Sequence, residues 1–471
     1  MTLEQPGAGA IRESDAHAGD FGQGRRTAPP LRIRARFTII AITSIALLLR
    51  LPTMDRPLVE AHAFRQTQTA YTALEYHRHG IDLLQTPLPV LGPPWVVPFE
   101  FPLFQAIAAL VMDAGVPSDL ALRLTSLVFF LLSAFLLVLI VRREAGERVA
   151  GIAVIAFMIA PLGLLWSRTS TIESLAVAAS LASVLGALRW DRGGSRRDFA
   201  LAIVFGAIAS LVKVTTAFVW LVPALFLLRR SRLAAVALVG VCLSLGVVWT
   251  FYADSIKLAT AATSWLASSS SVLREWTFGT LSSRLDPTTW ILSASWLIGL
   301  LGLLLILAPR ALAASRLGRW ALATLVLGPL VLSNLYGIHD YYWMAVAPAA
   351  AILVGLVIDH LLAMPDRGAA RVRLAAAGIL VALSFVLYPR WIQAYDGTDE
   401  SATLRLAAQI KSQTRPEDLI AISGRDWSPA LLYYADRRGF MEVPGRQHAP
   451  VGYVHFECPI PGRPGDCVRS P

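Results

Sequence analysis

A set of chemically capable side chains stands at the ends of long apolar runs. They are Asp55, Glu60, Glu100, Arg168, Glu173, Lys213, His339, Asp340, Tyr341 and Tyr342. Carboxylates can accept a proton, and Lys, Arg and His can hold a negatively charged group through charge-assisted hydrogen bonds. Ionisable groups at membrane depth are costly and are therefore functional candidates. Gathered on one face of a helical bundle, they are typical of a site that handles an anionic, lipid-linked substrate.

The acidic residues and the lysine also have structural interpretations. Asp55 can cap a helix that follows it, and Glu60 and His62 can be solvated loop residues. Lys213 can extend towards lipid headgroups, as lysines at the ends of membrane spans do. These alternatives stay open at the level of the single residue.

The remaining candidates have structural alternatives as well. Tyr341, Tyr342 and Trp343 can form an aromatic belt at the membrane interface. Arg168 and Glu173 can form an ion pair with no chemical role. The joint arrangement is more informative than its members, because independent structural residues would be shared between both faces of the bundle.

The chain that carries these residues is too apolar to fold as a soluble globule. Hydrophobic residues make up 55% of its 471 residues, charged residues 16%, and the mean hydropathy is +0.57. A soluble domain has about 25% charged residues. The apolar runs recur regularly, and each can cross a bilayer core of about 30 Å. We therefore expect an α-helical polytopic membrane protein with about eleven transmembrane helices.

The excess of Lys and Arg, 42 against 32 acidic residues, is interpreted as a topology signal and not as a nucleic-acid-binding surface. The predicted spans are 37–52, 121–141, 149–166, 172–189, 198–213, 215–229, 233–252, 289–308, 319–335, 342–362 and 373–389. Arginines gather in alternate short loops: Arg142, Arg143 and Arg148; Arg189, Arg192, Arg196 and Arg197; Arg229, Arg230 and Arg232; Arg310, Arg316 and Arg319; Arg367, Arg371 and Arg373. The positive-inside rule places these loops in the cytoplasm. The N-terminus is then inside and the C-terminus outside.

This topology divides the chain into three parts. Residues 1–35 are predicted to be a disordered cytoplasmic tail, and residues 36–390 the transmembrane domain. Residues 391–471 are predicted to be a small external α/β domain, because helix-like and strand-like patterns alternate there. The helix-like stretches are 402–411 and 429–434, and the strand-like run is 419–422.

The first external loop, 53–120, is predicted to contain surface helices. Segment 61–79 has helical spacing but many polar residues, so it should lie along the membrane surface. Segment 101–113 is apolar but too short to cross. In the external tail, Cys458 and Cys467 are close in sequence and on a side where a disulfide could persist, although the sequence leaves their pairing open.

Short motifs spread over most of the chain add a resemblance to these patterns. They are Arg50-Leu51-Pro52, Glu100-Phe101-Pro102-Leu103-Phe104-Gln105, Arg123-Leu124-Thr125-Ser126, Lys213 at the tip of a helical hairpin, His339-Asp340-Tyr341-Tyr342, Gly424-Arg425-Asp426-Trp427-Ser428-Pro429 and Tyr433-Tyr434-Ala435-Asp436-Arg437-Arg438-Gly439. Together they resemble the GT-C superfamily of polytopic glycosyltransferases, in particular the branch of protein O-mannosyltransferases and lipid A aminoarabinose transferases.

The resemblance implies transfer of a sugar from a polyprenyl-phosphate donor to an acceptor at the external (periplasmic) face of the inner or plasma membrane, with inversion at the sugar carbon. A carboxylate would be the general base, and the candidates are Glu60, Asp55 and Glu100. Residues expected to bind the substrate are His62, Arg65, Gln66, Gln68, Arg168, Glu173, Lys213, His339, Asp340, Tyr341 and Tyr342. Relatives carry an Asp-Glu pair where this chain reads Phe64-Arg65-Gln66-Thr67-Gln68-Thr69, so the base stays open among the three carboxylates.

The expected partners are the lipid bilayer, the lipid-linked donor and an acceptor that is a glycan, a lipid or a protein; nucleic acid is not expected. We predict no metal and no other cofactor, because a monophosphate leaving group does not require one. The rival hypotheses are a transporter or lipid flippase and a structural subunit of an envelope complex. A transporter would show an internal repeat and charged residues at mid-span, neither of which the sequence contains.

Overall fold

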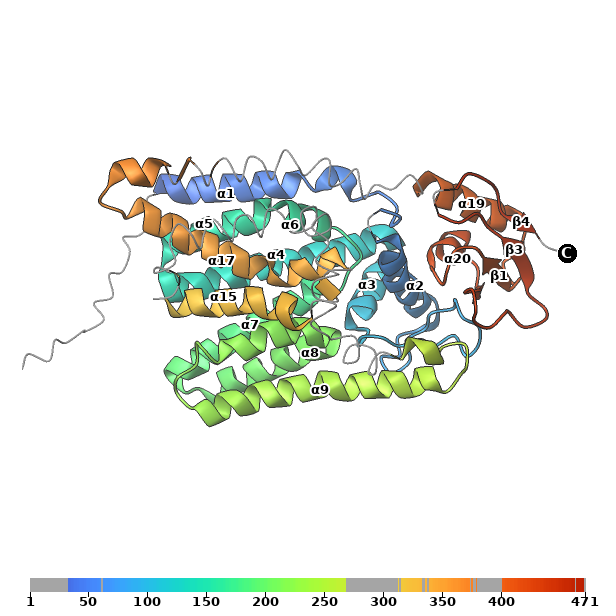
Figure 1. Ribbon diagram of the computed structural model, residues 1–471, viewed down its shortest axis with the longest axis horizontal. Helices are drawn as coiled ribbons and strands as arrows, with labels where there is room; N and C mark the ends of the chain where they lie inside the picture. Colours follow the sequence, from blue (N-terminus) through green and yellow to red (C-terminus); the bar gives the residue numbers. More distant parts are fainter. Residues whose placement is uncertain are drawn as a thin grey trace, which may run out of the picture.

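The computed structural model describes residues 33–60, 62–267, 312, 315–332, 335–336, 339–372, 374–375, 378, 400–461 and 463–469. Long helices lie side by side in a bundle, and a smaller unit that contains the strands covers one end of it (Figure 1). We call this end the domain end. The bundle helices are α1 (Ile33–Leu48), α4 (Ser118–Ala145), α5 (Glu147–Ile159), α6 (Pro161–Trp166), α7 (Glu173–Gly193), α8 (Arg196–Ala224), α9 (Arg232–Leu258), α15 (Arg316–Val331) and α17 (Trp343–Leu362).

Within the described ranges, four helices are long and apolar enough to cross a membrane: α4, α8, α9 and α17. The chain is therefore a helical polytopic membrane protein, as its composition predicts. Of the predicted spans, 289–308 lies outside the described residues, and so does most of 373–389. The predicted number of about eleven spans consequently stays a prediction.

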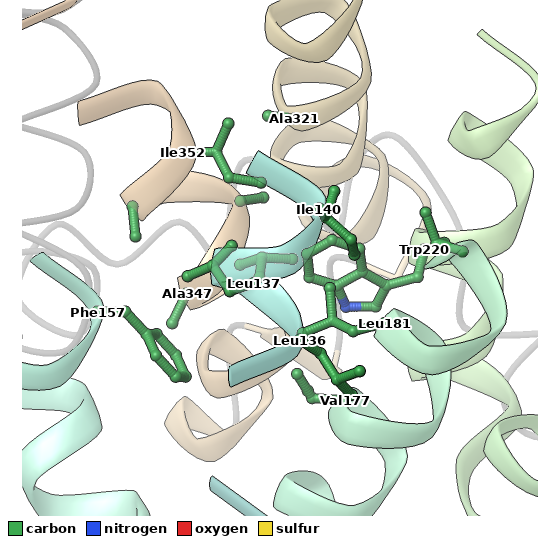
Figure 2. Close-up of a cluster of buried hydrophobic side chains, with 14 of the residues drawn as sticks. Leu136, Leu137, Ile140, Phe157, Val177, Leu181, Trp220, Ala321, Ala347 and Ile352 are labelled. Carbon is green, nitrogen blue, oxygen red and sulfur yellow. The ribbon is translucent and has the colours of Figure 1, made fainter. Parts of the chain in front are cut away.

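The core of the bundle is built from aliphatic and small side chains of α4, α5, α7, α8, α15 and α17 (Figure 2). Trp220 of α8 is fully buried and meets Trp320 of α15 edge to face, with ring centroids 5.3 Å apart. Helices α5 and α17 approach closely at Gly355, where a Cβ atom would lie 2.8 Å from the carbonyl oxygen of Val149. Small residues of this kind allow helices to pack tightly in a membrane, where the hydrophobic effect does not drive helices together.

Helix α8 folds back on itself at Lys213, whose backbone is extended (φ −160°, ψ 93°). The carbonyl of Ala202 accepts from Ser183 of α7, and the N–H groups of Arg229 and Arg230 donate to Asp191 at the end of α7. Lys213 instead pairs with Glu173 at the start of α7. At 1.5 Å per residue, this start lies about 27 Å from Asp191 at the other end of α7. Both ends of α8 therefore lie at one end of the bundle, and this geometry supports the predicted hairpin with Lys213 at its tip.

The helices at two of the predicted spans differ from those spans in extent. The predicted span 149–166 is divided into α5 and α6, because Pro161 opens α6 and has no N–H to continue the ladder of α5. Helix α9 extends to Leu258, beyond the predicted end at residue 252, and carries Asp254 and Lys257 on its added turns.

The arginine-rich loops gather at the end of the bundle opposite the domain end. Arg192 in the last turn of α7 pairs with Glu144 at the end of α4, 2.6 Å away, and Arg148 at the start of α5 pairs with Asp359 near the end of α17. The basic loops that alternate along the chain thus lie at the same end of the bundle.

At the domain end, α2 (Ala63–His79) and α3 (Leu103–Asp113) lie across the bundle (Figure 1). A helix on the membrane surface would leave its polar side open, but α2 is buried along most of its length, from Gln66 to Ala73 and at Glu75 and Tyr76. Segment 61–79 therefore forms the predicted non-spanning helix, but protein covers the polar side that was expected to face the surface. The reason is that α2 packs between α3, α4 and a helix of the C-terminal unit.

The C-terminal unit contains helices and strands at the predicted places. Its elements are α19 (Glu400–Ser412), β1 (Ile420–Ser423), α20 (Ala430–Ala435), β2 (Gly439–Met441), β3 (Val454–Glu457) and β4 (Val468–Arg469). The strand order is β2-β1-β3-β4, with β1 parallel to both neighbours and β4 antiparallel to β3. Cys458 and Cys467 are joined by a disulfide, which settles the pairing that the sequence left open.

The C-terminal unit and the first loop share a single hydrophobic core, although the sequence suggested a boundary at residue 391. The loop pairs with β2: Met441 donates to the carbonyl of Val90 at 2.7 Å, and Gly439 to that of Pro89 at 3.0 Å. Tyr433 of α20 donates to Asp119 of α4 at 2.7 Å. These contacts fix the unit directly over α2.

Candidate functional site

A first group of predicted residues forms a closed, buried ion cluster, the Glu60 cluster, made of Glu60, Arg123 and Arg168. Glu60 lies in the turn before α2, and its side chain is 2% exposed. Its Oε1 accepts from Arg123 at 2.7 Å, and its Oε2 accepts from Arg168 at 2.8 Å. Arg123 also donates to the carbonyl groups of Arg56, Pro57 and Arg168. The carboxylate has both oxygens engaged, and the cluster holds the loop onto α4.

A second group consists of Arg65, Glu100, Glu173 and Lys213, which we call the Lys213 cluster. Glu173 at the start of α7 pairs with Lys213 at the tip of α8, and both side chains are buried. The Lys213 ammonium lies 3.7 Å from the ring centroid of Tyr342 and 5.0 Å from that of Tyr341, within cation–π distance. The bend in α8 is what presents Lys213 to the end of the bundle.

Arg65 on α2 forms the other pair of this cluster, with Glu100 of the loop before α3, and donates to Gln68 at 2.7 Å. Burial opposes ionisation of both partners, but the opposite charge and the hydrogen bond prevail. The pKa of Glu100 is therefore lowered and that of Arg65 raised. The two pairs also attract each other electrostatically: Arg65 interacts with Glu173, and Lys213 interacts with Glu100. The two pairs thus form one electrostatic unit at the domain end.

Aromatic rings cover the Lys213 cluster on the side of the bundle. The ring of His62 lies 5.1 Å from Tyr341, 6.0 Å from His339 and 5.7 Å from Trp166, between centroids. His62 has a left-handed backbone (φ 53°), which is uncommon for a residue other than glycine and frequent at functional sites. Tyr341 stacks on His339, and burial raises its pKa well above the ordinary value.

Three buried polar atoms beside this cluster have no hydrogen-bond partner among the described residues: Oε2 of Glu173, Oγ of Ser170 and Nε1 of Trp166. Buried polar groups in proteins are nearly always paired, so each such atom requires an explanation. The Glu60 cluster, by contrast, has none. The unpaired atoms of the Lys213 cluster lie beside the Glu173–Lys213 pair, which faces the rings of Tyr341 and Tyr342, and they suit a polar ligand.

Other predicted site residues lie elsewhere. Asp55 is exposed and makes no ion pair with any described residue, so it is not joined to either cluster. Gln66 on α2 accepts from the N–H of Ser170 at 3.0 Å, an arrangement that fixes the backbone before α7. Asp340 begins the 3-10 helix η3 (Asp340–Tyr342), which positions the two tyrosines.

Sequence reasoning missed several residues of the site. Trp166 was not singled out, although an aromatic residue directly before Ser167-Arg168 at a span end was a usable signal. The buried pair of Lys257 and Asp254, 2.8 Å apart on α9, was also missed. Its signal was an acid and a base three residues apart at the end of an apolar run.

The Lys213 cluster can bind an anion and accept a proton at one place, next to apolar helices. The described residues include no group of three or more His, Cys, Asp or Glu side chains placed to hold a metal ion. The absence of a metal requirement stays a prediction.

Comparisons with known proteins show what the fold of the chain is similar to. A family model described as dolichyl-phosphate-mannose-protein mannosyltransferase matches residues 96–253. No curated protein matches the chain.

Similar solved structures cover most of the chain. ArnT from Cupriavidus metallidurans in the apo state has a TM-score of 0.58 and 15% identity, over 90% of this chain and 94% of ArnT. The same protein bound to undecaprenyl phosphate has a TM-score of 0.56 and 18% identity, over 87% of each chain. The archaeal oligosaccharyltransferase AglB from Archaeoglobus fulgidus, in complex with an inhibitory peptide and a dolichol-phosphate, has a TM-score of 0.57 and 13% identity, over 87% of this chain and 65% of AglB.

Proposed function

We propose that the chain, which shares the fold of ArnT and AglB, is a glycosyltransferase of the GT-C superfamily and moves a sugar from a polyprenyl-phosphate carrier to an acceptor hydroxyl. Two of the similar structures are described with a polyprenyl phosphate of this kind, undecaprenyl phosphate in ArnT and a dolichol-phosphate in AglB. The likeness supports a lipid-phosphate donor for this chain as well.

The observation that carries the proposal is the composition of the Lys213 cluster. Lys213 and Arg65 supply two cations at the end of an apolar bundle, and Ser170 and Trp166 add unpaired donors. A polyprenyl phosphate has a long apolar tail and an anionic head, so it needs apolar helices next to cations. The domain end offers both.

The proposed reaction is a single displacement at the sugar carbon. The acceptor oxygen forms a bond to that carbon while the bond from the carbon to the phosphate oxygen breaks. The phosphate leaves with the electron pair of the broken bond, and Lys213 and Arg65 stabilise its growing negative charge. The acceptor hydroxyl transfers its proton to a carboxylate, and the configuration at the sugar carbon inverts.

Among the three predicted carboxylates, Glu100 is the best placed to accept that proton. Glu60 has both oxygens bound by arginines, and Asp55 is outside the cluster. The Glu100 side chain is 24% exposed and belongs to the same charged unit as Lys213. We therefore assign Glu100 the base role and Glu60 a holding role.

The proposed site faces the non-cytoplasmic side of the inner or plasma membrane. The support for this is the gathering of the arginine-rich loops at the opposite end of the bundle, which the positive-inside rule assigns to the cytoplasm. The disulfide in the C-terminal unit is consistent with an oxidising compartment at the domain end.

The test is an assay of polyprenyl phosphate release from a polyprenyl-phosphate sugar by the purified, reconstituted protein. The wild type should release the lipid phosphate. Arg65→Met should slow release by roughly 100-fold, because one cation at the leaving group is lost. Arg148→Met, which breaks a comparable arginine–carboxylate pair at the opposite end, should retain the wild-type rate. Solute transport across vesicles without any donor consumption would contradict the proposal.

A further inference from the structure

A small polar cavity is lined by both partners of the Arg65–Glu100 pair and by Gln105 of α3. It measures about 10 Å³, which is room for a single water-sized group. Polar side chains make up most of its lining: Arg65, Gln68, Thr69, Thr72, Thr86, Glu100 and Gln105. The apolar remainder is Leu88, Val97 and Phe99. A cavity this small and this polar is built for one hydrogen-bonding group.

One lining side chain has an unpaired oxygen. Oε1 of Gln105 has no hydrogen-bond partner among the described residues, and the residue is 6% exposed. The neighbouring Thr86 hydroxyl is directed at the hydroxyl of Tyr76, which itself donates to the carbonyl oxygens of Asp82 and Gln85, both at 2.8 Å. Gln105 Oε1 can only accept, so its missing partner is a donor. A hydroxyl group supplies such a donor.

The rim of the cavity differs from its floor. Gln105, Thr86, Thr69 and Thr72 are buried, whereas Arg65, Phe99 and Glu100 are partly exposed. A ligand group therefore reaches the floor past Glu100, the residue to which the proposed function gives the acceptor's proton. The cavity and the base then act on neighbouring groups of one ligand.

A partly exposed aromatic cluster lies beside the same rim. Trp427 of the C-terminal unit packs against Phe64 at 4.4 Å, Phe99 at 5.8 Å and Trp265 at 5.8 Å, between ring centroids. These rings come from α2, the first loop, the 3-10 helix η2 (Ser264–Leu266) that follows α9, and the C-terminal unit. Aromatic faces next to a few polar groups are typical of sites that hold a small ring-shaped ligand.

We propose that this cavity is an acceptor subsite which takes the hydroxyl next to the reacting one, so that the acceptor is a saccharide with neighbouring hydroxyls. The inference rests on the proposed function. A serine or threonine side chain has one hydroxyl, which the transfer itself uses, and would leave Gln105 unpaired. A saccharide presents a second hydroxyl on the adjacent carbon, and its ring can lie against Phe99 and Trp427.

The experiment uses the full-length reconstituted protein, a polyprenyl-phosphate sugar and three kinds of acceptor probe: methyl glycosides of common hexoses, their monodeoxy analogues and a serine-containing peptide. The best methyl glycoside should outperform one of its monodeoxy analogues by roughly 10- to 100-fold in kcat/KM, the usual cost of leaving a buried polar group unpaired. Gln105→Met should reduce this discrimination towards one. Thr324→Val removes another buried, unpaired hydroxyl, in α15, and should leave the discrimination unchanged.

A second readout separates the subsite from a trapped structural water. If the floor is kept for a ligand, Gln105→Met should not lower the thermal midpoint of the ligand-free protein, because it removes a group that has no partner there. A fall in that midpoint with unchanged acceptor discrimination would assign the cavity to a structural water and overturn the inference. Transfer to the peptide but to no glycoside would also overturn it and leave the proposed function intact. Failure to release polyprenyl phosphate with any acceptor would instead count against the proposed function.

Discussion

The two ion clusters at the domain end are built from the same residue types but differ in how completely they are paired. In the Glu60 cluster every carboxylate oxygen meets a guanidinium group, and the arginines also bind backbone carbonyls. In the Lys213 cluster one oxygen of Glu173 and two neighbouring donors have no partner among the described residues. Saturated buried charges hold a structure together, whereas unsaturated ones leave capacity for a ligand. The comparison therefore assigns stability to the first cluster and chemistry to the second.

The largest effect on activity is expected from the double variant Glu173→Gln, Lys213→Met. Removing both charges avoids an unpaired buried ion, so the protein should fold. Release of polyprenyl phosphate should fall by roughly 100- to 1000-fold, because a cation aimed at the leaving phosphate is lost. The checks are the donor assay and size-exclusion chromatography of the same sample. A folded double variant with the wild-type rate would break the comparison.

Glu60→Gln is expected to have the largest effect on stability. It leaves Arg123 and Arg168 without their carboxylate in a buried place, which costs about 3–5 kcal/mol of unfolding free energy. The thermal midpoint in detergent should drop markedly, while the folded fraction keeps most of its rate of donor consumption. The reverse result, normal stability with no activity, would return Glu60 to the role of base.

Glu100→Gln should reduce transfer to the acceptor by about 10²- to 10⁴-fold, the usual contribution of a general base. In the wild type, the lowered pKa of Glu100 keeps the pair with Arg65 charged at neutral pH. The stability that this pair contributes is fully present above the pKa of an unfolded glutamate, and it is lost as the pH falls through the lower folded value. The rate should therefore fall only in acid. A rate that fell between pH 6 and 8 would require another titrating group.

Asp55→Asn should have the smallest effect. Asp55 is exposed and outside both clusters, so we expect less than about a twofold change in rate and a stability change within about 0.5 kcal/mol. The donor assay and the thermal midpoint check both. A large loss of rate would show that the first turn after α1 moves onto the site when substrate binds.

The sequence allowed a good part of this arrangement to be predicted. The lengths of the apolar runs located α4, α7 and α17, because crossing a bilayer demands a fixed length. Lys213 was expected at a hairpin tip, because a charged side chain is costly at membrane depth and the turn between two apolar runs avoids that cost. The positions of α19, β1 and α20 in the C-terminal unit also agree with the local sequence patterns.

The pairing of the charges could not be predicted in the same way. Arg65 and Glu100 are 35 residues apart and meet only because α2 is turned across the end of the bundle. Arg123 was noticed as part of a motif, but its binding to Glu60 depends on the path of the loop. Trp427 meets Phe64 only when the C-terminal unit is in place, a long-range contact that no local pattern encodes.

The most direct test of the central claim is to locate a bound lipid phosphate by determining the structure of the protein with undecaprenyl phosphate. The account predicts that the phosphate lies within hydrogen-bond distance of Lys213 and Arg65, with its tail along the apolar helices. A phosphate held instead by the arginines at the opposite end of the bundle would contradict it.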